Sequence, residues 1–215
     1  MQVKFVAGTT HPEMSPEEFL AYCARVSNPS NQMNHESSAK LLRYLINNAH
    51  WSPLEMASAT LEIVTTRDIA RQILRHRSFS FQEFSQRYAD VTQGGLNFVK
   101  RDARLQDTKN RQNSIETEDE ELLDWWDTQQ QYLIDDVDYL YREALRRGIA
   151  KEQARAVLPE GITESRLYMS GTIRSWVHYC DLRSSNGTQA EHMEVAKAAS
   201  NELNKIYPSL FKVYE

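Results

Sequence analysis

The sequence is short of glycine, and this shortage excludes the usual ways of binding phosphate through backbone amides. It has seven glycines in 215 residues, less than half of the ordinary usage of roughly 7%. Neither G-x-G-x-x-G nor G-x-x-x-x-G-K-[ST] occurs in it. A ligand that carries phosphate would therefore have to be held by side chains, and the arginine guanidinium is the group best suited to that task.

Cysteine is scarcer still. Cys23 and Cys180 are the only two, and they form no Cys-x-x-Cys pair, so we expect neither a disulfide scaffold nor a structural zinc site, and a cytoplasmic location is the default. The six histidines contain no His-x-x-x-His or H-E-x-x-H arrangement. We therefore expect no metal ion.

Long apolar runs and an excess of positive charge are also lacking. No stretch approaches the roughly 18–20 apolar residues of a membrane-spanning helix, and the first residues have the pattern of a strand rather than of a secretory leader. The formal net charge is −5 and the pI is near 5.7, which argues against a surface devoted to nucleic acid. We expect neither a membrane nor a nucleic acid as partner.

Hydrophobic periodicity predicts one α+β domain over residues 1–215, because no repeat, linker or low-complexity tract divides the chain. A Ser15-Pro16-Glu17-Glu18 start signals the first helix. The predicted strands are 2–7, 59–66 and 164–170, with weaker candidates at 86–91 and 98–99. The predicted helices are 15–26, 35–48, 67–74, 122–148, 151–157, 173–182 and 188–206.

The charge changes sign abruptly along the chain. Residues 71–111 carry nine Lys or Arg against four Asp or Glu, whereas residues 112–140 carry ten Asp or Glu and no Lys or Arg. The acidic stretch also has helical apolar spacing, so we interpret its charge as a solvated helix face. The Trp125-Trp126 pair in it fits either the core or a subunit interface.

The densest cationic segment is Arg71-Gln-Ile-Leu-Arg-His-Arg77. On a helix, Arg71, Gln72 and Arg75 share a face, whereas the three consecutive residues 75–77 cannot. Guanidinium groups suit phosphate and flat polar edges such as a uracil or flavin ring. Arginines at a helix end are often ordinary surface charge. Here Ser, Glu, Ser, Arg and Tyr follow at fixed spacing within residues 80–88, which favours a binding site.

Four segments together resemble the flavin-dependent thymidylate synthase family. The chain reads R-H-R-S-F-S-F-Q-E-F-S-Q-R-Y at 75–88, similar to the family form R-H-R-x-x-S-x-N-E-x-S-x-R-Y, and departs from it only at Gln82. Residues 50–55 are similar to H-x-[ST]-P-x-E, residues 154–159 to A-R-x-x-L-P, and residues 174–191 to the helix pair that closes the site. The likeness covers roughly residues 1–206 and implies a small, mostly antiparallel sheet packed with long α-helices.

The resemblance implies reductive methylation of dUMP to dTMP in de novo dTMP biosynthesis. Methylenetetrahydrofolate would give the carbon, and FAD reduced by NADPH would give the hydride. The family is a homotetramer whose sites draw residues from several subunits, so we expect that one chain does not hold a complete site.

The resemblance also implies which side chains meet each ligand. For dUMP they are Gln72, Arg75, Glu83, Ser85, Gln86, Arg87, Arg155 and Arg183. For FAD they are Ser52, Glu55, Arg75, His76, Arg77, Ser78, Glu83, Arg174, His178, Leu182 and Gly187. His50 would lie beside the flavin and the folate path, and the expected catalytic set is Arg183, His50 and Ser85. Gly187 replaces a histidine that can approach the flavin, and His178 replaces a common asparagine.

Several alternatives remain at this point. We assign Arg183 to the charge that develops on the uracil carbonyl edge; Ser85 either positions the nucleotide or, with His76 as base, acts as a nucleophile. Cys180 is expected to be a packing residue, and His192 a structural or surface one. A different class of function is a protein that binds nucleotides or RNA without catalysis, with Tyr88 and Phe98 stacking on bases. A relative that binds flavin but does not methylate is a third.

Overall fold

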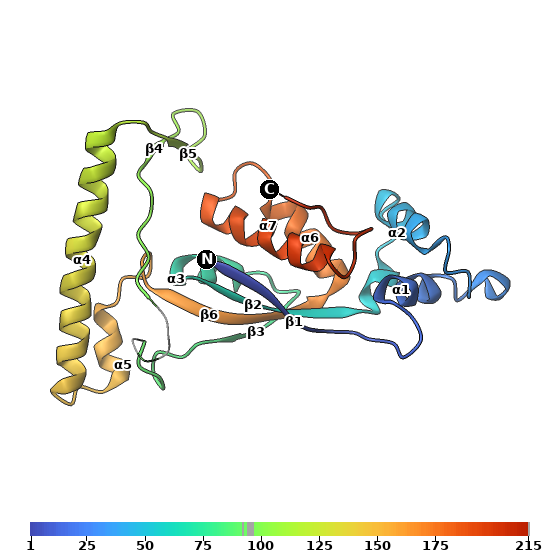
Figure 1. Cartoon of the computed structure of the whole chain (residues 1–215), viewed down its shortest axis with the longest axis horizontal. Helices are drawn as coiled ribbons and strands as arrows, with labels where there is room; N and C mark the ends of the chain where they lie inside the picture. Colours follow the sequence, from blue (N-terminus) through green and yellow to red (C-terminus); the bar gives the residue numbers. More distant parts are fainter. Residues whose placement is uncertain (92, 94–96, 215) are drawn as a thin grey trace.

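The computed structural model describes residues 1–91, 93 and 97–214, and its centre is a four-stranded antiparallel sheet (Figure 1). The strands are β1 (Gln2–Gly8), β2 (Ser58–Thr66), β6 (Glu164–Thr172) and β3 (Ser80–Glu83), in the order β1-β2-β6-β3. β2 and β6 pair along their whole length, from Ser58 with Thr172 to Thr66 with Glu164. The predicted α+β class with an antiparallel sheet is thereby confirmed.

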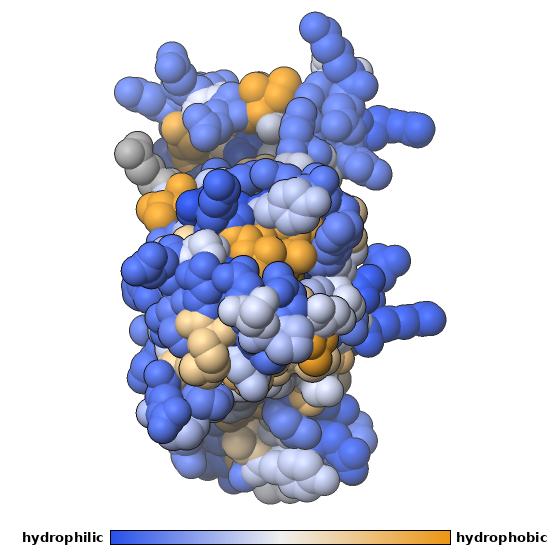
Figure 2. Space-filling model, turned by 90° about the vertical axis from the view of Figure 1, so that its right-hand side faces the viewer, coloured by the Kyte–Doolittle hydropathy of each residue, from blue (hydrophilic) through white to orange (hydrophobic). Residues whose placement is uncertain are grey.

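Helices cover one face of this sheet and one of its ends. α3 (Arg67–Ile73), α6 (Ile173–Arg183) and α7 (Ala190–Asn204) lie on the same face, and α1 (Pro16–Ala24) and α2 (Ser38–Asn47) lie at the end where β1 finishes (Figure 1). The short helices η1 (Pro29–Asn31) and η2 (Ser52–Glu55) flank α2. Figure 2 views that end, where apolar side chains form small patches among polar ones.

Local sequence explains where these elements begin. The Ser15 hydroxyl accepts a hydrogen bond from the Glu18 backbone amide, and the Glu18 carboxylate accepts one from the Ser15 amide, so α1 has the complete capping box that its sequence predicts. Along β2 the burial alternates, with Leu61 and Ile63 fully buried beneath α6 and α7. This alternation directs one face of the sheet into the main core.

A long helix stands beside this body. α4 (Glu120–Arg146) follows the small hairpin of β4 (Arg104–Gln106) and β5 (Ser114–Glu116), and α5 (Lys151–Ala154) and η3 (Arg155–Val157) follow it (Figure 1). The second half of α4 closes a smaller core. Its members are Val91, Val137, Tyr141, Ala144, Ala154 and Leu158. No helix in the described part of the chain combines the length and apolarity needed to span a membrane.

The apolar stripe of α4 is only partly covered. Val137 and Ala144 are buried, but Trp125 is 55% exposed, Trp126 37%, Leu133 45% and Leu140 49%. The core alternative for the tryptophan pair is therefore wrong, while the subunit-interface alternative stays a prediction.

The weak strand predicted at residues 86–91 is also wrong. β3 ends at Glu83, and the amides of Tyr88 and Ala89 both donate to the Ser85 carbonyl, which closes a turn. Ser85 starts this turn and Arg87 lies within it, so neither residue belongs to a strand. Phe98 makes a single bridge to Thr163 rather than a strand, and it packs against the smaller core.

Candidate active site

The cationic segment continues beyond α3 into a turn that contains residues 75–78. Its backbone continues from α3 through the hydrogen bonds His76 to Ile73 (3.0 Å) and Phe79 to His76 (3.2 Å). The Phe79 ring packs on Trp176 with centroids 4.8 Å apart. It occupies the space that a side chain at position 171 would need, so Gly171 is required there. This packing anchors Arg75, His76, Arg77 and Ser78 against α6.

His76 and Arg183 meet across this contact. Arg183 Nε donates to His76 Nε2 at 3.0 Å. Burial, followed by the charges of Arg183 and Arg75, lowers the pKa of His76 from its ordinary value to about 4. The imidazole is therefore neutral at pH 7 and serves as an acceptor that orients the guanidinium. Because His76 Nε2 accepts from Arg183, His76 is not placed to act as a base for Ser85. No hydrogen bond joins the His76 and Ser85 side chains in the described structure.

One exposed face of α6 gathers several of the residues expected at FAD. Arg174, His178 and Leu182 follow each other at intervals of four and therefore share a face. Arg174 Nη1 contacts Glu55 Oε1 at 2.5 Å, and the His178 ring lies 4.3 Å from the Trp51 ring, centroid to centroid. The Ser175 hydroxyl donates to the Ser78 carbonyl at 3.4 Å. Residues from η2, α6 and the turn after α3 thus form one surface.

Gln72 of α3 contacts the N-terminal end of α7 on the same side of the sheet. Gln72 Nε2 donates to Gln189 Oε1 at 2.7 Å, although 117 positions separate the two residues. Gly187, just before this point, has φ +93°, a left-handed conformation that strains any other residue. The backbone thus accounts for glycine where the resemblance implies a histidine.

A second group of expected dUMP residues lies near α5 and η3. Arg87 Nη2 is 3.7 Å from Glu152 Oε2, and Arg155 Nε donates to the Glu152 carbonyl at 3.3 Å. Gln86 is 4% exposed, and its Nε2 has no hydrogen-bond partner among the described residues. A buried amide without a partner is a feature expected of a ligand site.

The two groups make no polar contact with each other among the described residues of one chain. In the part of the chain that the structure describes, no hydrogen bond or ion pair links Gln72, Arg75, His76 or Arg183 to Ser85, Gln86, Arg87 or Arg155. Glu83, expected at both ligands, is turned into the sheet, where it accepts a hydrogen bond from Ser165 at 2.7 Å and lies 3.7 Å from Arg67. His50 is exposed near Tyr44 and bonds to neither group through its side chain.

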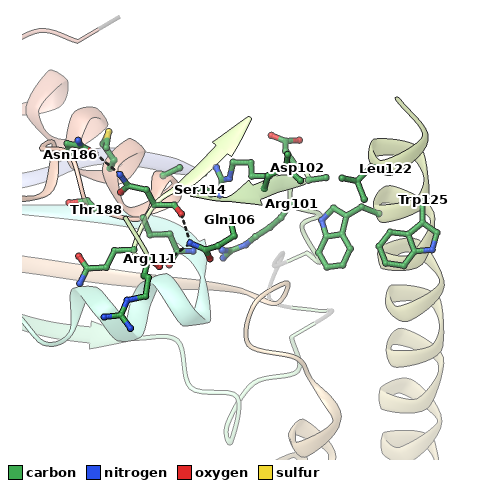
Figure 3. Close-up of a pocket in the computed structure, with 18 residues that line it drawn as sticks. Arg101, Asp102, Gln106, Arg111, Ser114, Leu122, Trp125, Asn186 and Thr188 are labelled. Carbon is green, nitrogen blue, oxygen red and sulfur yellow. Dashed lines mark hydrogen bonds between the residues drawn. The ribbon is translucent and has the colours of Figure 1, made fainter. Parts of the chain in front are cut away.

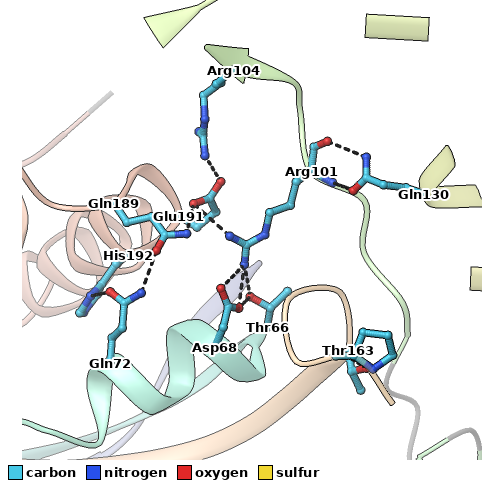
Figure 4. Close-up of polar contacts among 11 residues, drawn as sticks. Thr66, Asp68, Gln72, Arg101, Arg104, Gln130, Thr163, Gln189, Glu191 and His192 are labelled. Atoms are coloured by element: carbon cyan, nitrogen blue, oxygen red, sulfur yellow. Dashed lines mark hydrogen bonds and ion pairs between the residues drawn. The ribbon is translucent and has the colours of Figure 1, made fainter. Parts of the chain in front are cut away.

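A cleft of about 760 Å³ adjoins Gln189. Figure 3 shows Arg111 and Asn186 on one side of it and Leu122 and Trp125 of α4 on the other. Arg101, at its edge, donates to Thr66 and Asp68 at 2.7 Å and lies 3.4 Å from Glu191, which also pairs with Arg104 (Figure 4). Sequence reasoning missed these arginines, although both belong to the basic segment 71–111.

The titratable groups outside these clusters fit packing rather than chemistry. Cys180 is buried, and burial, followed by the nearby Asp181 carboxylate, raises the pKa of its thiol. His192 is fully buried, which agrees with its structural alternative and excludes the surface one. Among the described residues, no three His, Cys, Asp or Glu side chains gather in a way that could hold a metal ion.

Known proteins resemble this chain over nearly its whole length. Residues 11–209 match the family described as thymidylate synthase complementing protein. A probable flavin-dependent thymidylate synthase of Paramecium bursaria Chlorella virus 1 is 51% identical over 93% of this chain and 90% of its own. The flavin-dependent thymidylate synthase of Synechocystis sp. is 48% identical over 100% of both. In structure, the UMP/dUMP methylase PolB of Streptomyces cacaoi, bound with 5-Br dUMP, matches with a TM-score of 0.81 and 28% identity over 97% of this chain and 92% of its own.

Proposed function

This chain belongs to the family of flavin-dependent thymidylate synthases, and we propose that it methylates dUMP to dTMP with a bound flavin. The observation that carries the proposal is the convergence of distant motif segments on one surface. The R-H-R turn, α6 and the start of α7 come together through the Arg183–His76 and Gln72–Gln189 hydrogen bonds. We further propose FAD as the flavin, NADPH as its reductant and methylenetetrahydrofolate as the carbon donor.

The residues of the α6 surface fit a flavin dinucleotide by their chemistry. Arg174, Arg75 and Arg77 supply cations for a diphosphate, and the tilted His178 and Trp51 rings provide flat contacts for an aromatic system. Ser52, Ser78 and Glu55 add hydrogen-bonding groups at the rim. When bound, the reduced flavin supplies the hydride that the reaction needs.

Arginine side chains would hold the nucleotide. A nucleotide phosphate carries two negative charges, which two or three arginines with hydroxyl groups can balance without any glycine-rich loop. Arg87 and Arg155 with Ser85 and Gln86 form one such set, and Arg75 with Gln72 adds a cation and an amide from the other group. We assign Arg183 to the uracil carbonyl edge, where negative charge develops, and Ser85 to positioning.

We propose that the complete site forms when chains assemble as a homotetramer in the cytoplasm. The separation of the two dUMP groups within one chain and the exposed apolar stripe of α4 support the assembly. Both cysteines are free, which fits a reducing compartment. We interpret residues 1–215 as one domain of this type.

The proposal is tested by growth and by colour. A bacterial strain that requires thymidine should grow without it when this chain is expressed, because the chain would then make dTMP from dUMP. An enzyme that methylated only UMP would not supply dTMP and would not rescue growth. The purified protein should be yellow or turn yellow with FAD, and NADPH should bleach it in the absence of air. A chain that binds FAD and bleaches without rescuing growth would contradict the methylation, and a colourless chain with steep salt-dependent RNA binding would contradict the enzyme.

A further inference from the structure

A continuous series of hydrogen bonds runs through half-buried and buried polar side chains between α3, α6 and α7 (Figure 4). It starts at Glu191, passes through Gln189, Gln72 and His192, and ends at Tyr179. Every member except Tyr179 is drawn in Figure 4, and the four bonds measure 2.9, 2.7, 3.2 and 3.2 Å in that order. The direction of each bond can be worked out from one end.

Glu191 fixes the direction because an ionised carboxylate only accepts. Burial raises the pKa of its carboxyl, but its own backbone amide, the Gln189 amide and the guanidinium groups of Arg101 and Arg104 outweigh burial and hold that pKa below the ordinary value. Glu191 is therefore charged at pH 7. The side chain that faces it must donate, so Gln189 turns its amide nitrogen toward Glu191.

The orientation of Gln189 in turn determines the orientation of the Gln72 amide. With its nitrogen facing Glu191, Gln189 offers its oxygen, and Gln72 must turn its own amide nitrogen to that oxygen. The oxygen of Gln72 then faces His192 Nδ1. The network thus settles the orientation of an amide whose oxygen and nitrogen are otherwise hard to tell apart.

His192 completes the series as a donor of one defined tautomer. Its Nδ1 must carry the proton to donate to the Gln72 oxygen, so its Nε2 accepts from the Tyr179 hydroxyl. Burial, followed by Arg183 and His76, lowers the pKa of His192 to about 3, which keeps the ring neutral. Burial, followed by the Cys180 thiol, raises the pKa of Tyr179, which keeps its proton.

We propose that His192 and Gln189 are positioning residues that lock the Gln72 amide so that it presents an N–H donor to the nucleotide. This inference rests on the proposed function, since Gln72 meets dUMP only if the site does. The Gln72 nitrogen has two protons, and Gln189 is its only acceptor among the described residues. The second proton is free to reach an acceptor oxygen of the nucleotide, and the locked amide loses no rotamer freedom on binding.

The test is a double-mutant cycle read out as the dissociation constant of dUMP by calorimetry. His192→Leu should weaken dUMP binding about tenfold, the worth of one net hydrogen bond. In a Gln72→Ala background the same change should have less than about a twofold effect, because coupling exists only through the shared partner. His192→Asn should bind within about threefold of the unchanged chain, since its amide can replace the Nδ1 donor.

A role of His192 in packing alone, without coupling to Gln72, would give a different pattern. The losses from His192→Leu and Gln72→Ala would then add, and His192→Asn would not rescue binding; either result overturns the inference. Long-range ¹H–¹⁵N spectra of histidine-labelled protein should also show the Nδ1–H tautomer of His192 without any ligand, and the Nε2–H tautomer would contradict the network. An unchanged chain that fails to bind dUMP would contradict the proposed function instead, so the two failures are distinguishable.

Discussion

At the scale of single residues, Arg183 shows how the fold prepares a side chain for chemistry. One nitrogen of its guanidinium is engaged by the neutral His76 ring, which fixes its orientation. The two terminal nitrogens have no hydrogen-bond partner among the described residues, and they form the part of the fork best suited to a carbonyl edge. His76 therefore acts on the proposed reaction by aiming Arg183.

Replacing Arg183 should slow the chemical step more than it weakens binding. We expect Arg183→Ala to lower kcat at saturating dUMP by about 10²–10³, the usual loss when one charge-stabilising donor is removed. Arg183→Lys should recover only part of this loss, because an ammonium group cannot donate to His76 and to the substrate in the same fixed geometry. The measurement is dTMP formation under single-turnover conditions.

The matched control is Arg147→Ala at the end of α4, an exposed arginine that pairs with Glu143 in its own helix. This variant should keep the kcat of the unchanged chain. A near-normal rate for Arg183→Ala would show that the developing charge is stabilised elsewhere.

At the scale of elements, the segment before β4 is held by α4 rather than by the sheet. Gln130, buried on α4, accepts from the Arg101 amide at 2.8 Å and donates to the Arg101 carbonyl at 2.9 Å. This pair of bonds replaces the neighbouring strand that residue 101 lacks. It leaves the Arg101 side chain directed at Asp68 and Glu191, next to the network that holds Gln72.

Gln130→Leu should therefore destabilise the segment before β4. We expect a loss of about 1–3 kcal/mol, because the half-buried amide and carbonyl of residue 101 would lose their partners. Hydrogen exchange at the residue 101 amide should accelerate, and thermal unfolding should begin at a lower temperature. Gln129→Leu, at an exposed neighbouring position, is the control and should change neither. Equal exchange rates in the two variants would contradict the role of Gln130.

Helices and strands can be predicted from the sequence where the pattern that specifies them involves neighbouring residues. The Ser15 capping box and the alternation of β2 predict α1 and β2 to within a few residues, because each pattern acts between neighbours. Residues 86–91 are also a strand candidate by sequence, yet no strand forms there. Their hydrogen bonds close on Ser85 instead, and pairing depends on a neighbouring strand that a local pattern does not specify.

At the scale of the whole molecule, α4 leaves part of its apolar stripe exposed between Trp126 and Leu140. Trp126, Leu133 and Leu140 continue the helical stripe whose other members are buried. An exposed stripe of this kind marks an interaction surface. A second copy of the chain is the proposed partner, since each chain separates two groups of residues that the proposed reaction needs together.

Charges placed on this stripe should break the assembly and the activity together. We expect the unchanged chain to form a particle of four 25.0 kDa chains, and Leu133→Glu with Leu140→Glu to give smaller particles without dUMP methylation, because burying the new charges is costly. Light scattering after size exclusion measures the mass. Gln131→Glu, on the opposite side of the same helix from Leu133 and Leu140, should keep both properties. A monomer with full activity would contradict shared sites.

The sequence by itself determined the α+β class, the motif segments and the residue types of the proposed site, in which arginine would hold the phosphate. Those signals are carried by neighbours in the chain and by the chemistry of each side chain. The tertiary structure alone decided that Gln72 meets Gln189 across 117 positions, that His192 is buried with one proton assignment, and that Arg87 and Arg155 both contact Glu152. Periodicity shows that a helix face is apolar, but what covers that face depends on how distant segments pack.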